Sequence, residues 1–207
     1  MPINRPPLEW ISLILVLLIA LPIHEFAHAW TATRFGDSTP RMNGRLTLNP
    51  LAHLDPIGSL LLLIAGFGWA KPVPVNPYAL EKHSSSALML VSFAGPFSNF
   101  LLALLAAIPI RLGLGNLLPG LSEIIYFFIY INLVLMVFNL IPLAPLDGEK
   151  IAIYLLPPNF ARIFDSIRPY SPLILMMIFV AGFTLHVNII YSIIGPPVEA
   201  LFNLLVG

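Results

Sequence analysis

Cysteine is absent from this 207-residue sequence, and charged residues make up only 10% of it. Without a thiol, the chain has no disulfide, no thiolate metal site and no cysteine nucleophile. The formal net charge is zero and Lys and Arg form no cluster, so we expect no nucleic-acid partner. Internal repeats and low-complexity tails are also missing.

Hydrophobic residues are abundant instead, at 58% compared with roughly 45–50% in soluble domains. Four runs approach the roughly 20 residues that a helix needs to cross a bilayer: Leu8–Ile23, Ala87–Ile110, Ile124–Ile141 and Leu173–Ile194. We predict an all-α membrane protein, a polytopic helical bundle that forms one integral-membrane domain over residues 1–207. Its helices are expected near 8–30, 86–110, 121–141 and 171–195, the last being an additional C-terminal helix.

A fifth apolar run, Ile57–Ala70, is too short to cross comfortably, and a run of this length is more often re-entrant or interfacial. We therefore expect a re-entrant segment at about 57–77. Its second part, GWAKPVPVN at 68–76, alternates around prolines, which sheets confine to their edge strands. Such an edge strand could pair with an extended peptide. A plain connecting loop is the alternative.

The Lys and Arg residues predict the orientation. Eight of the ten fall in the connections 31–85 and 142–170: Arg34, Arg41, Arg45, Lys71, Lys82, Lys150, Arg162 and Arg168. Only Arg5 and Arg111 lie on the opposite side. We therefore expect a multi-pass protein of the cell membrane, with both connections in the cytoplasm and the N-terminus outside the cell. This holds only if the run at 57–70 does not cross.

The N-terminal run has a second interpretation, a cleavable signal peptide. Arg5 precedes its apolar core, and Ala27-His28-Ala29 has the small-x-small form of a cleavage site. The weakly polar start, the length of the segment and the membrane-embedded remainder of the chain favour a retained helix.

The sequence HEFAH at residues 24–28 reads H-E-x-x-H at the end of the first apolar run. Positions i and i+4 of a helix lie on one face, so His24 and His28 can bind one zinc ion. Glu25 can then take a proton from a water on that metal, which is the chemistry of peptide-bond hydrolysis. A chance pattern is the alternative, but ionisable groups in an apolar span are costly and rarely lack a function.

A catalytic zinc site usually has three protein ligands, so one ligand must come from elsewhere. The remaining candidates are His53, Asp55, His83, Glu123, Asp147, Glu149, Asp165, His186 and Glu199. Glu123, His186 and Glu199 are predicted near or beyond the outer face, away from HEFAH. Asp147 stands out because Pro142 and Pro145 break the helix before it and Gly148 allows a sharp turn. A helix N-cap is its alternative role, and both roles could coexist.

Four motifs together resemble the site-2 protease family of intramembrane zinc metalloproteases: HEFAH at 24–28, GRLTLNPLAHLDPIG at 44–58, GPFSN at 95–99 and NLIPLAPLDG at 139–148. The resemblance implies that His24, His28 and Asp147 bind one Zn²⁺ per chain and that Glu25 is the catalytic acid/base. It also implies a catalytic core of three helices, at 8–30, 86–110 and 121–141. Many members carry a PDZ or nucleotide-sensing CBS domain, and we expect neither within these 207 residues.

Asparagines and one further histidine accompany these motifs. Asn139, which lies seven residues after Asn132, is interpreted as a catalytic-site residue that holds the substrate backbone or the developing oxyanion. An interhelical hydrogen bond is the alternative. For Asn99 we favour helix packing. His53 could approach the metal site as a hydrogen-bond donor or gate, although a structural hydrogen bond is favoured.

The function predicted from these residues is zinc-dependent endopeptidase activity on peptide bonds in or near transmembrane segments. The expected substrate is a single-pass transmembrane protein in the lipid bilayer, with a regulatory partner protein as a further possibility. A metal-ion carrier is the first alternative, because buried His, Asp and Asn also describe an ion pathway. A non-catalytic membrane scaffold is the second, and the intact Glu25 argues against it.

Overall fold

A computed structural model describes residues 6–65, 68–185 and 189–207. Within these ranges every regular element is a helix, and the only β-pairing is an isolated bridge between Leu54 and Ala70. Five helical stretches of this described part are long and apolar enough to cross a membrane: Pro7–Arg34, Ala87–Arg111, Leu121–Asn139, Asn159–Gly182 and Ile189–Val206. The predicted all-α, polytopic class is confirmed.

The first stretch changes its hydrogen-bonding pattern along its length. It consists of α1 (Pro7–Leu15), a π-helical turn, η1 (Val16–Ala20), and α2 (Leu21–Arg34). Pro22 lies two residues after the end of the π turn and cannot donate an i to i−4 hydrogen bond, which gives the helix a reason to depart from the α pattern here. The predicted helix 8–30 therefore exists, but it is longer and contains one wide turn just before HEFAH.

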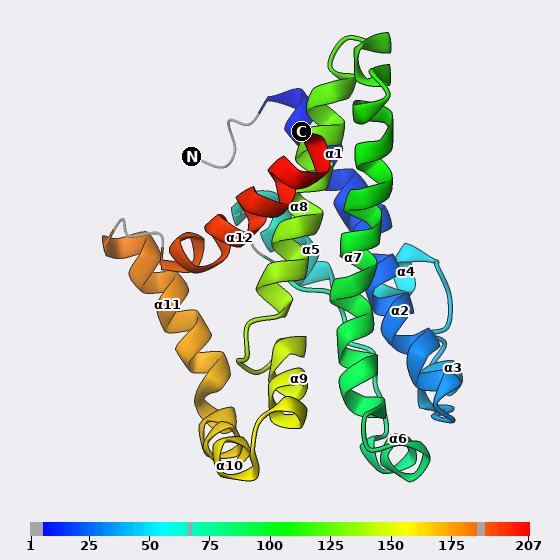
Figure 1. Cartoon of the computed structure of the whole chain (residues 1–207), viewed down its shortest axis with the longest axis vertical. Coiled ribbons are helices and arrows are strands. Elements are labelled where there is room, and N and C mark those ends of the chain that lie inside the picture. The colour runs from blue at the N-terminus through cyan, green and yellow to red at the C-terminus, as the bar shows by residue number, and fades with distance from the viewer. Residues whose placement is uncertain (1–5, 66–67, 186–188) are drawn as a thin grey trace.

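Two further long helices pack against the first stretch and form the centre of the bundle (Figure 1). They are α7 (Ala87–Arg111) and α8 (Leu121–Asn139), close to the predicted ranges 86–110 and 121–141. Small residues such as Ala103 and Ala107 of α7 pack against Ile129 and Leu133 of α8 in the buried core. Small side chains let helix backbones approach closely, which is the usual basis of helix association in membranes.

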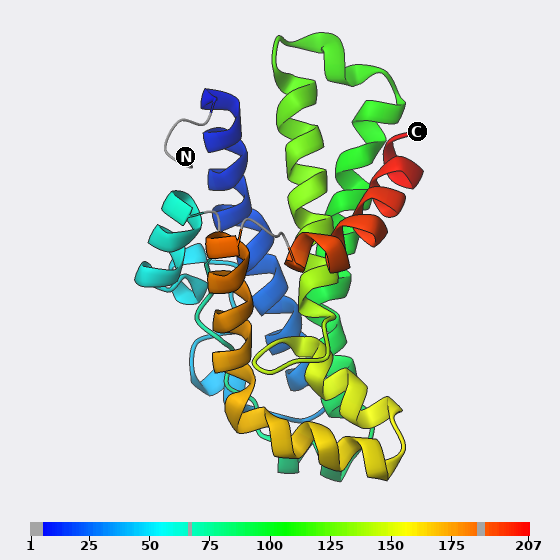
Figure 2. The same cartoon turned by 90° about the vertical axis from the view of Figure 1, so that its left-hand side faces the viewer.

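The C-terminal region differs from the prediction of one helix at 171–195. After α9 (Asp147–Leu155), α10 (Pro158–Ile167) and the 3₁₀ turn η3 (Arg168–Tyr170), the chain forms two helices, α11 (Ser171–Leu185) and α12 (Ile189–Val206). Figures 1 and 2 show α11 rising from the end of α10, and α12 continuing towards the opposite end of the molecule at a steep angle. The two helices thus follow one another along the long axis.

Arg111, the last residue of α7, fixes the far end of α12. Its guanidinium donates hydrogen bonds to the carbonyl oxygens of Leu204 and Leu205. Cationic side chains commonly satisfy the last carbonyls of a helix in this way. The C-terminal end of α12 therefore lies at the same end of the molecule as the C-terminal end of α7.

The connection between the first stretch and α7 contains a segment that leaves a short helix, α4 (Pro50–His53), and comes back beside it. The connection also contains α3 (Thr39–Met42), α5 (Pro56–Ala65) and α6 (Pro77–His83). The helix α5 has 10 residues and is therefore only about 15 Å long. The bridge from Leu54 to Ala70 brings both ends of the excursion together, and Lys71 N–H donates to the His53 carbonyl at 2.7 Å. This is the arrangement expected of a segment that does not cross.

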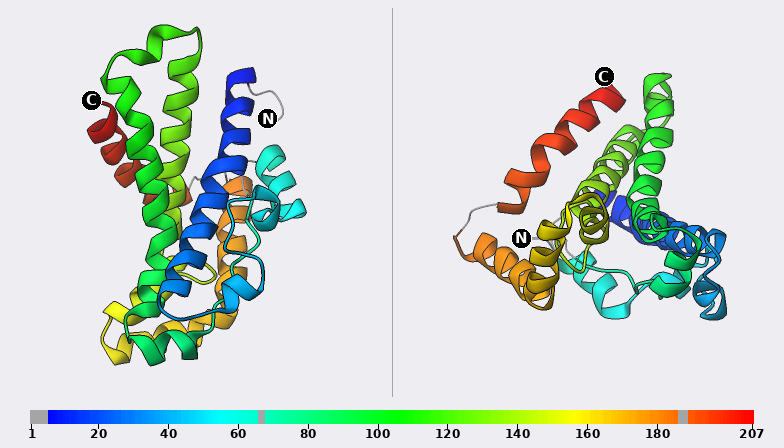
Figure 3. Two further views of the ribbon diagram at one scale, coloured as in Figure 1. Left: turned by 90° about the vertical axis from the view of Figure 1, so that its right-hand side faces the viewer. Right: turned by 60° about the horizontal axis from the view of Figure 1, so that its bottom comes forward.

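The predicted edge strand at 68–76 does not form. Residues 71–76, called here the proline segment, belong to no regular element and join no ladder. The N–H groups of Val73 and Asn76 donate to the side chains of Glu25 and Asp37 rather than to a neighbouring strand, so no ladder continues beyond the bridge at Ala70. Figure 3 shows α3, α4 and α5 of this connection beside α1 and α2, on the side away from α12, whereas α6 lies against the end of α7.

Candidate metal centre

His24 and His28 lie one turn apart on the face of α2 that packs against α7. Both are buried, and their Nε2 atoms are 3.0 Å apart. The close contact between the two helices depends on Gly95 of α7, because a Cβ atom there would lie 2.3 Å from Nε2 of His28 and 2.6 Å from Nε2 of His24. No real Cβ contact is that short, so only glycine leaves space for the two rings.

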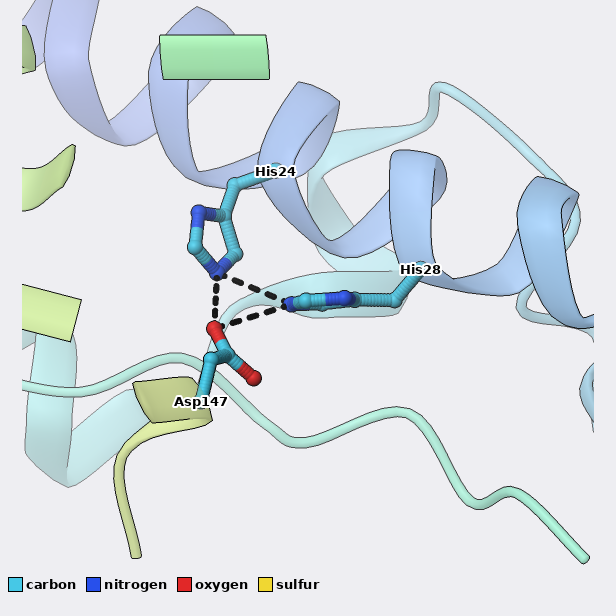
Figure 4. A group of neighbouring side chains, drawn as sticks. All are labelled: His24, His28 and Asp147. Atoms are coloured by element: carbon cyan, nitrogen blue, oxygen red, sulfur yellow. Dashed lines mark hydrogen bonds and ion pairs between the residues drawn. The ribbon is translucent and has the colours of Figure 1, made fainter. Parts of the chain in front are cut away.

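Asp147 reaches the same point from the opposite direction, at the start of α9 (Figure 4). Its Oδ2 atom lies 3.3 Å from Nε2 of His24 and 3.2 Å from Nε2 of His28. The turn before it is tight, since a Cβ atom on Gly148 would lie 2.3 Å from the Leu140 carbonyl oxygen. The alternative role as an N-cap is wrong: Leu146 occupies the N-cap position, and Asp147 is the first helical residue.

The environment of Asp147 favours its ionised form. Burial alone would raise the pKa of the carboxyl group, but attraction to His28 and hydrogen bonds from the rings of His24 and His28 hold the pKa well below its usual value. A carboxylate must be ionised to bind a metal. The three side chains thus offer two imidazole nitrogens and one anionic oxygen.

The spacing of these three donor atoms fits a tetrahedral zinc site. Their mutual distances are 3.0, 3.2 and 3.3 Å. Ligand atoms about 2.0–2.1 Å from a tetrahedral Zn²⁺ are separated by about 3.3–3.4 Å. In the described part of the chain, these residues form the only group of three His, Cys, Asp or Glu side chains close enough to hold a metal ion. Three ligands leave one position for water, as in catalytic zinc sites.

The other ring nitrogens of both histidines are held by α7. Nδ1 of His28 lies 2.7 Å from the Val91 carbonyl oxygen, and Nδ1 of His24 lies 2.7 Å from Oδ1 of Asn99. Because both partners are acceptors, each Nδ1 donates its proton to α7, and each Nε2 is the ring nitrogen that faces Asp147 and can bind a metal once it is deprotonated. The imidazoles are therefore oriented before any metal binds.

Asn99 makes a contact that the sequence did not reveal. Helix packing was the favoured interpretation, and the residue is indeed fully buried, but it also joins His24 to Asn132, donating from Nδ2 to Oδ1 of Asn132 at 3.1 Å. Asn132 in turn donates to the Phe128 carbonyl at 2.9 Å. A polar residue at an apolar helix–helix contact was the available signal, but the sequence does not say which histidine it faces.

Glu25 faces the cavity beside the three donor residues. This cavity measures about 390 Å³, and its wall includes Glu25, Asp147 and Asn139 together with Pro72 and Val73 of the proline segment. The carboxylate is buried, and its Oε2 atom accepts a hydrogen bond from the Val73 N–H at 3.2 Å. A carboxylate in this position can exchange a proton with a molecule bound in the cavity.

The remaining predicted residues lie in different places. Asn139 lines the cavity but makes no interhelical hydrogen bond among the described residues; its Nδ2 atom donates to the Leu135 carbonyl of its own helix. His53 is fully buried and bonds through Nε2 to the Thr47 carbonyl at 2.7 Å, which confirms the structural interpretation. Arg5 and His186 lie outside the described residues.

Comparison with known proteins gives a consistent result. The model of peptidase family M50 matches residues 116–182, which include Asn139 and Asp147 but not HEFAH. The chain is 42% identical over 176 residues to YwhC of Bacillus subtilis, covering 81% of this chain and 80% of that protein. It is 33% identical over 170 residues to Rip2 of Mycobacterium tuberculosis, covering 79% of this chain and 64% of that protein.

A third relative is Rip2 of Mycolicibacterium smegmatis, which is 30% identical over 190 residues, covering 84% of this chain and 70% of that protein. All three relatives are named as candidate zinc metalloproteases. No solved structure matches the chain.

Proposed function

The chain belongs to peptidase family M50, and on this premise we propose which of its residues carry out the family's chemistry and from which side of the membrane. It is a multi-pass, membrane-embedded zinc metalloprotease that acts on membrane-protein substrates. The observation that carries the assignment of residues is the convergence of two α2 imidazoles and the α9 carboxylate, with donor atoms 3.0–3.3 Å apart.

His24, His28 and Asp147 would hold one Zn²⁺ per chain, because their Nε2, Nε2 and Oδ2 atoms converge. When bound, the ion supplies a water of lowered pKa and polarises the carbonyl of the scissile peptide. Asn99 and the Val91 carbonyl keep the two imidazoles in the required orientation through their Nδ1 atoms. Gly95 keeps space for both rings.

Glu25 moves the proton. Its carboxylate takes a proton from the attacking water and returns it to the nitrogen of the leaving amine. Asn139, whose amide lines the same cavity, contacts the substrate backbone near the reacting carbonyl. The proline segment, which also lines the cavity, binds the substrate in an extended conformation, because a helical peptide hides its scissile bonds.

The site lies below the surface of the membrane on the cytoplasmic side. His24 precedes the end of its helix at Arg34 by ten residues, a depth of about 15 Å. The connections at that end carry most of the Lys and Arg residues, which favours their location in the cytoplasm. The substrate is then a single-pass transmembrane segment in the cell membrane that unwinds near its cytoplasmic half, and a partner protein regulates access.

The decisive experiment compares wild-type protein with Glu25→Gln in proteoliposomes that contain a single-pass transmembrane substrate. Loss of the proton-transferring group should slow cleavage by about 10²- to 10⁴-fold, while metal content stays unchanged. Undiminished cleavage by the variant would remove Glu25 from the mechanism. Metal-dependent ion flux without cleavage, measured in the same vesicles, would instead support the carrier alternative.

A further inference from the structure

Arg45 is a buried cation whose recorded partners are all backbone carbonyls. It is only 4% exposed, and in the part of the chain that the structure describes no carboxylate lies within ion-pair distance. Its Nη2 atom donates to the carbonyl oxygens of Lys71 and Pro72 at 2.9 and 2.6 Å, and its Nη1 atom donates to the Ala52 carbonyl. One guanidinium therefore joins α4 to the proline segment.

A buried charge is expensive to desolvate. Without a counter-charge, the guanidinium of Arg45 must be stabilised by its hydrogen bonds to the three carbonyl oxygens. The planar guanidinium has five donors in a fixed fork, which suits it to hold several carbonyls at once. Here the carbonyls belong to Ala52 on one side and to Lys71 and Pro72 on the other. The chain between them leaves α4 and returns to it, and this stretch, 55–69, is called the excursion. Arg45 closes this excursion at its base, next to the Leu54–Ala70 bridge.

A second buried charge holds the other end of the same segment. Asp37, 1% exposed, accepts a hydrogen bond through Oδ2 from the Asn76 N–H at 2.7 Å. Its Oδ1 atom accepts from the Thr39 N–H at 2.9 Å. The proline segment is thus fixed at Lys71–Pro72 by a cation and at Asn76 by an anion. Between these anchors lies Val73, whose N–H meets Glu25.

We propose that Arg45 is a positioning residue of the active site, which acts through the proline segment by holding the Val73 N–H against the Glu25 carboxylate. Pro72 and Pro74 have no N–H of their own, so between them only Val73 can donate a backbone hydrogen bond, and it donates to the catalytic carboxylate. This inference rests on the proposed role of Glu25. It assigns a function to the GRLTLNPLAH stretch beyond a structural connection.

The test measures cleavage rate and bound metal together for Arg45→Gln in proteoliposomes. Misplacing a catalytic group by an ångström costs up to about a hundredfold, so the rate should fall about tenfold or more while metal content stays at the wild-type level. Arg41→Gln, which removes an exposed arginine four residues away, should leave both unchanged. Arg45→Lys, whose ammonium cannot bridge all three carbonyls, should give an intermediate rate and serves if the glutamine variant does not fold.

A double-mutant cycle separates positioning from general destabilisation. Val73→Pro removes the N–H that donates to Glu25, whereas Val73→Ala shortens the same side chain but keeps this N–H. The difference in cleavage rate between these two variants therefore measures the effect of the N–H itself. If Arg45 acts through this N–H, Arg45→Gln should slow the Val73→Pro protein by less than about twofold, because effects that share one contact do not multiply. Multiplying effects, a parallel loss of metal, or a wild-type rate for Arg45→Gln would each overturn the proposal. Cleavage by wild type but not by Glu25→Gln would show that the proposed function itself still stands.

Discussion

Nδ1 of His24 lies 2.7 Å from Oδ1 of Asn99, and this amide also donates to Asn132. The contact joins the first helix of the bundle to the second and the second to the third. It fixes the amide of Asn99 as well, because Nδ2 must face Asn132 for Oδ1 to face the imidazole. A metal ligand on α2 therefore depends for its orientation on polar residues of α7 and α8.

We expect Asn99→Ala to weaken metal binding by about 10- to 100-fold, the usual effect of removing the partner of a metal-binding histidine. Asn132→Ala, one hydrogen bond further away, should have a smaller effect. Asn203→Ala, an exposed asparagine of α12, should have none. Competition with a chromophoric chelator measures the affinities. Equal affinities for wild type and Asn99→Ala would show that the amide does not support the site.

Removal of a proposed ligand should abolish metal binding rather than only weaken it. His24→Ala and Asp147→Asn each leave two donors where a catalytic zinc site needs three. Elemental analysis of purified protein should give about one Zn²⁺ per chain for wild type and much less for both variants. Asp165→Asn, which neutralises an exposed carboxylate on α10, is the matched control and should keep its metal. Full zinc content in Asp147→Asn would disprove the assignment of the third ligand.

Gly95→Ala adds one methyl group at the tightest point between α2 and α7. The new Cβ atom would meet Nε2 of His28 at 2.3 Å, so one helix must move or the rings must rotate away from Asp147. We expect loss of both metal and activity in protein that still inserts into the membrane. Ser98→Ala, one turn further along α7, should retain both. If Gly95→Ala bound zinc normally, the contact between these helices would have to be looser than described.

The orientation can be tested with single cysteines, because the natural chain has none. Glu81→Cys lies in the connection before α7, and Leu118→Cys lies in the connection between α7 and α8; both positions are exposed. A membrane-impermeant maleimide added to intact cells should label only Leu118→Cys, and both variants after the cells are opened. The opposite pattern would place the active site near the outer surface.

The sequence predicted the site correctly where the spacing of residues along one helix determines their relative positions. His24 and His28 are brought together by helical periodicity alone, and Asp147 was recognised by its helix break on the same side. Asn99 could not be assigned in this way because its partners come from two other helices. Arg45 was used only as a positive charge that indicates orientation and Asp37 was not singled out, because only the folded connection shows that both are buried.

The elements were predicted with similar limits. Hydropathy located the three central helices because each is a continuous apolar run. It joined α11 and α12 into one helix because the run Leu173–Ile194 contains only isolated polar residues, which a long window averages out. The edge strand at 68–76 was expected from alternating prolines, but the N–H groups of Val73 and Asn76 bind the buried side chains of Glu25 and Asp37, and the sequence does not show these contacts between distant residues.

The π turn at Val16–Ala20 has a consequence for how this chain can vary. One residue advances an α-helix by about 100°, so a single insertion or deletion upstream changes the phase of everything that follows. A wide turn four residues before His24 can take up such a change locally. The N-terminal half of the first helix can then keep its buried face against α8, while the C-terminal half keeps its two histidines aimed at α9.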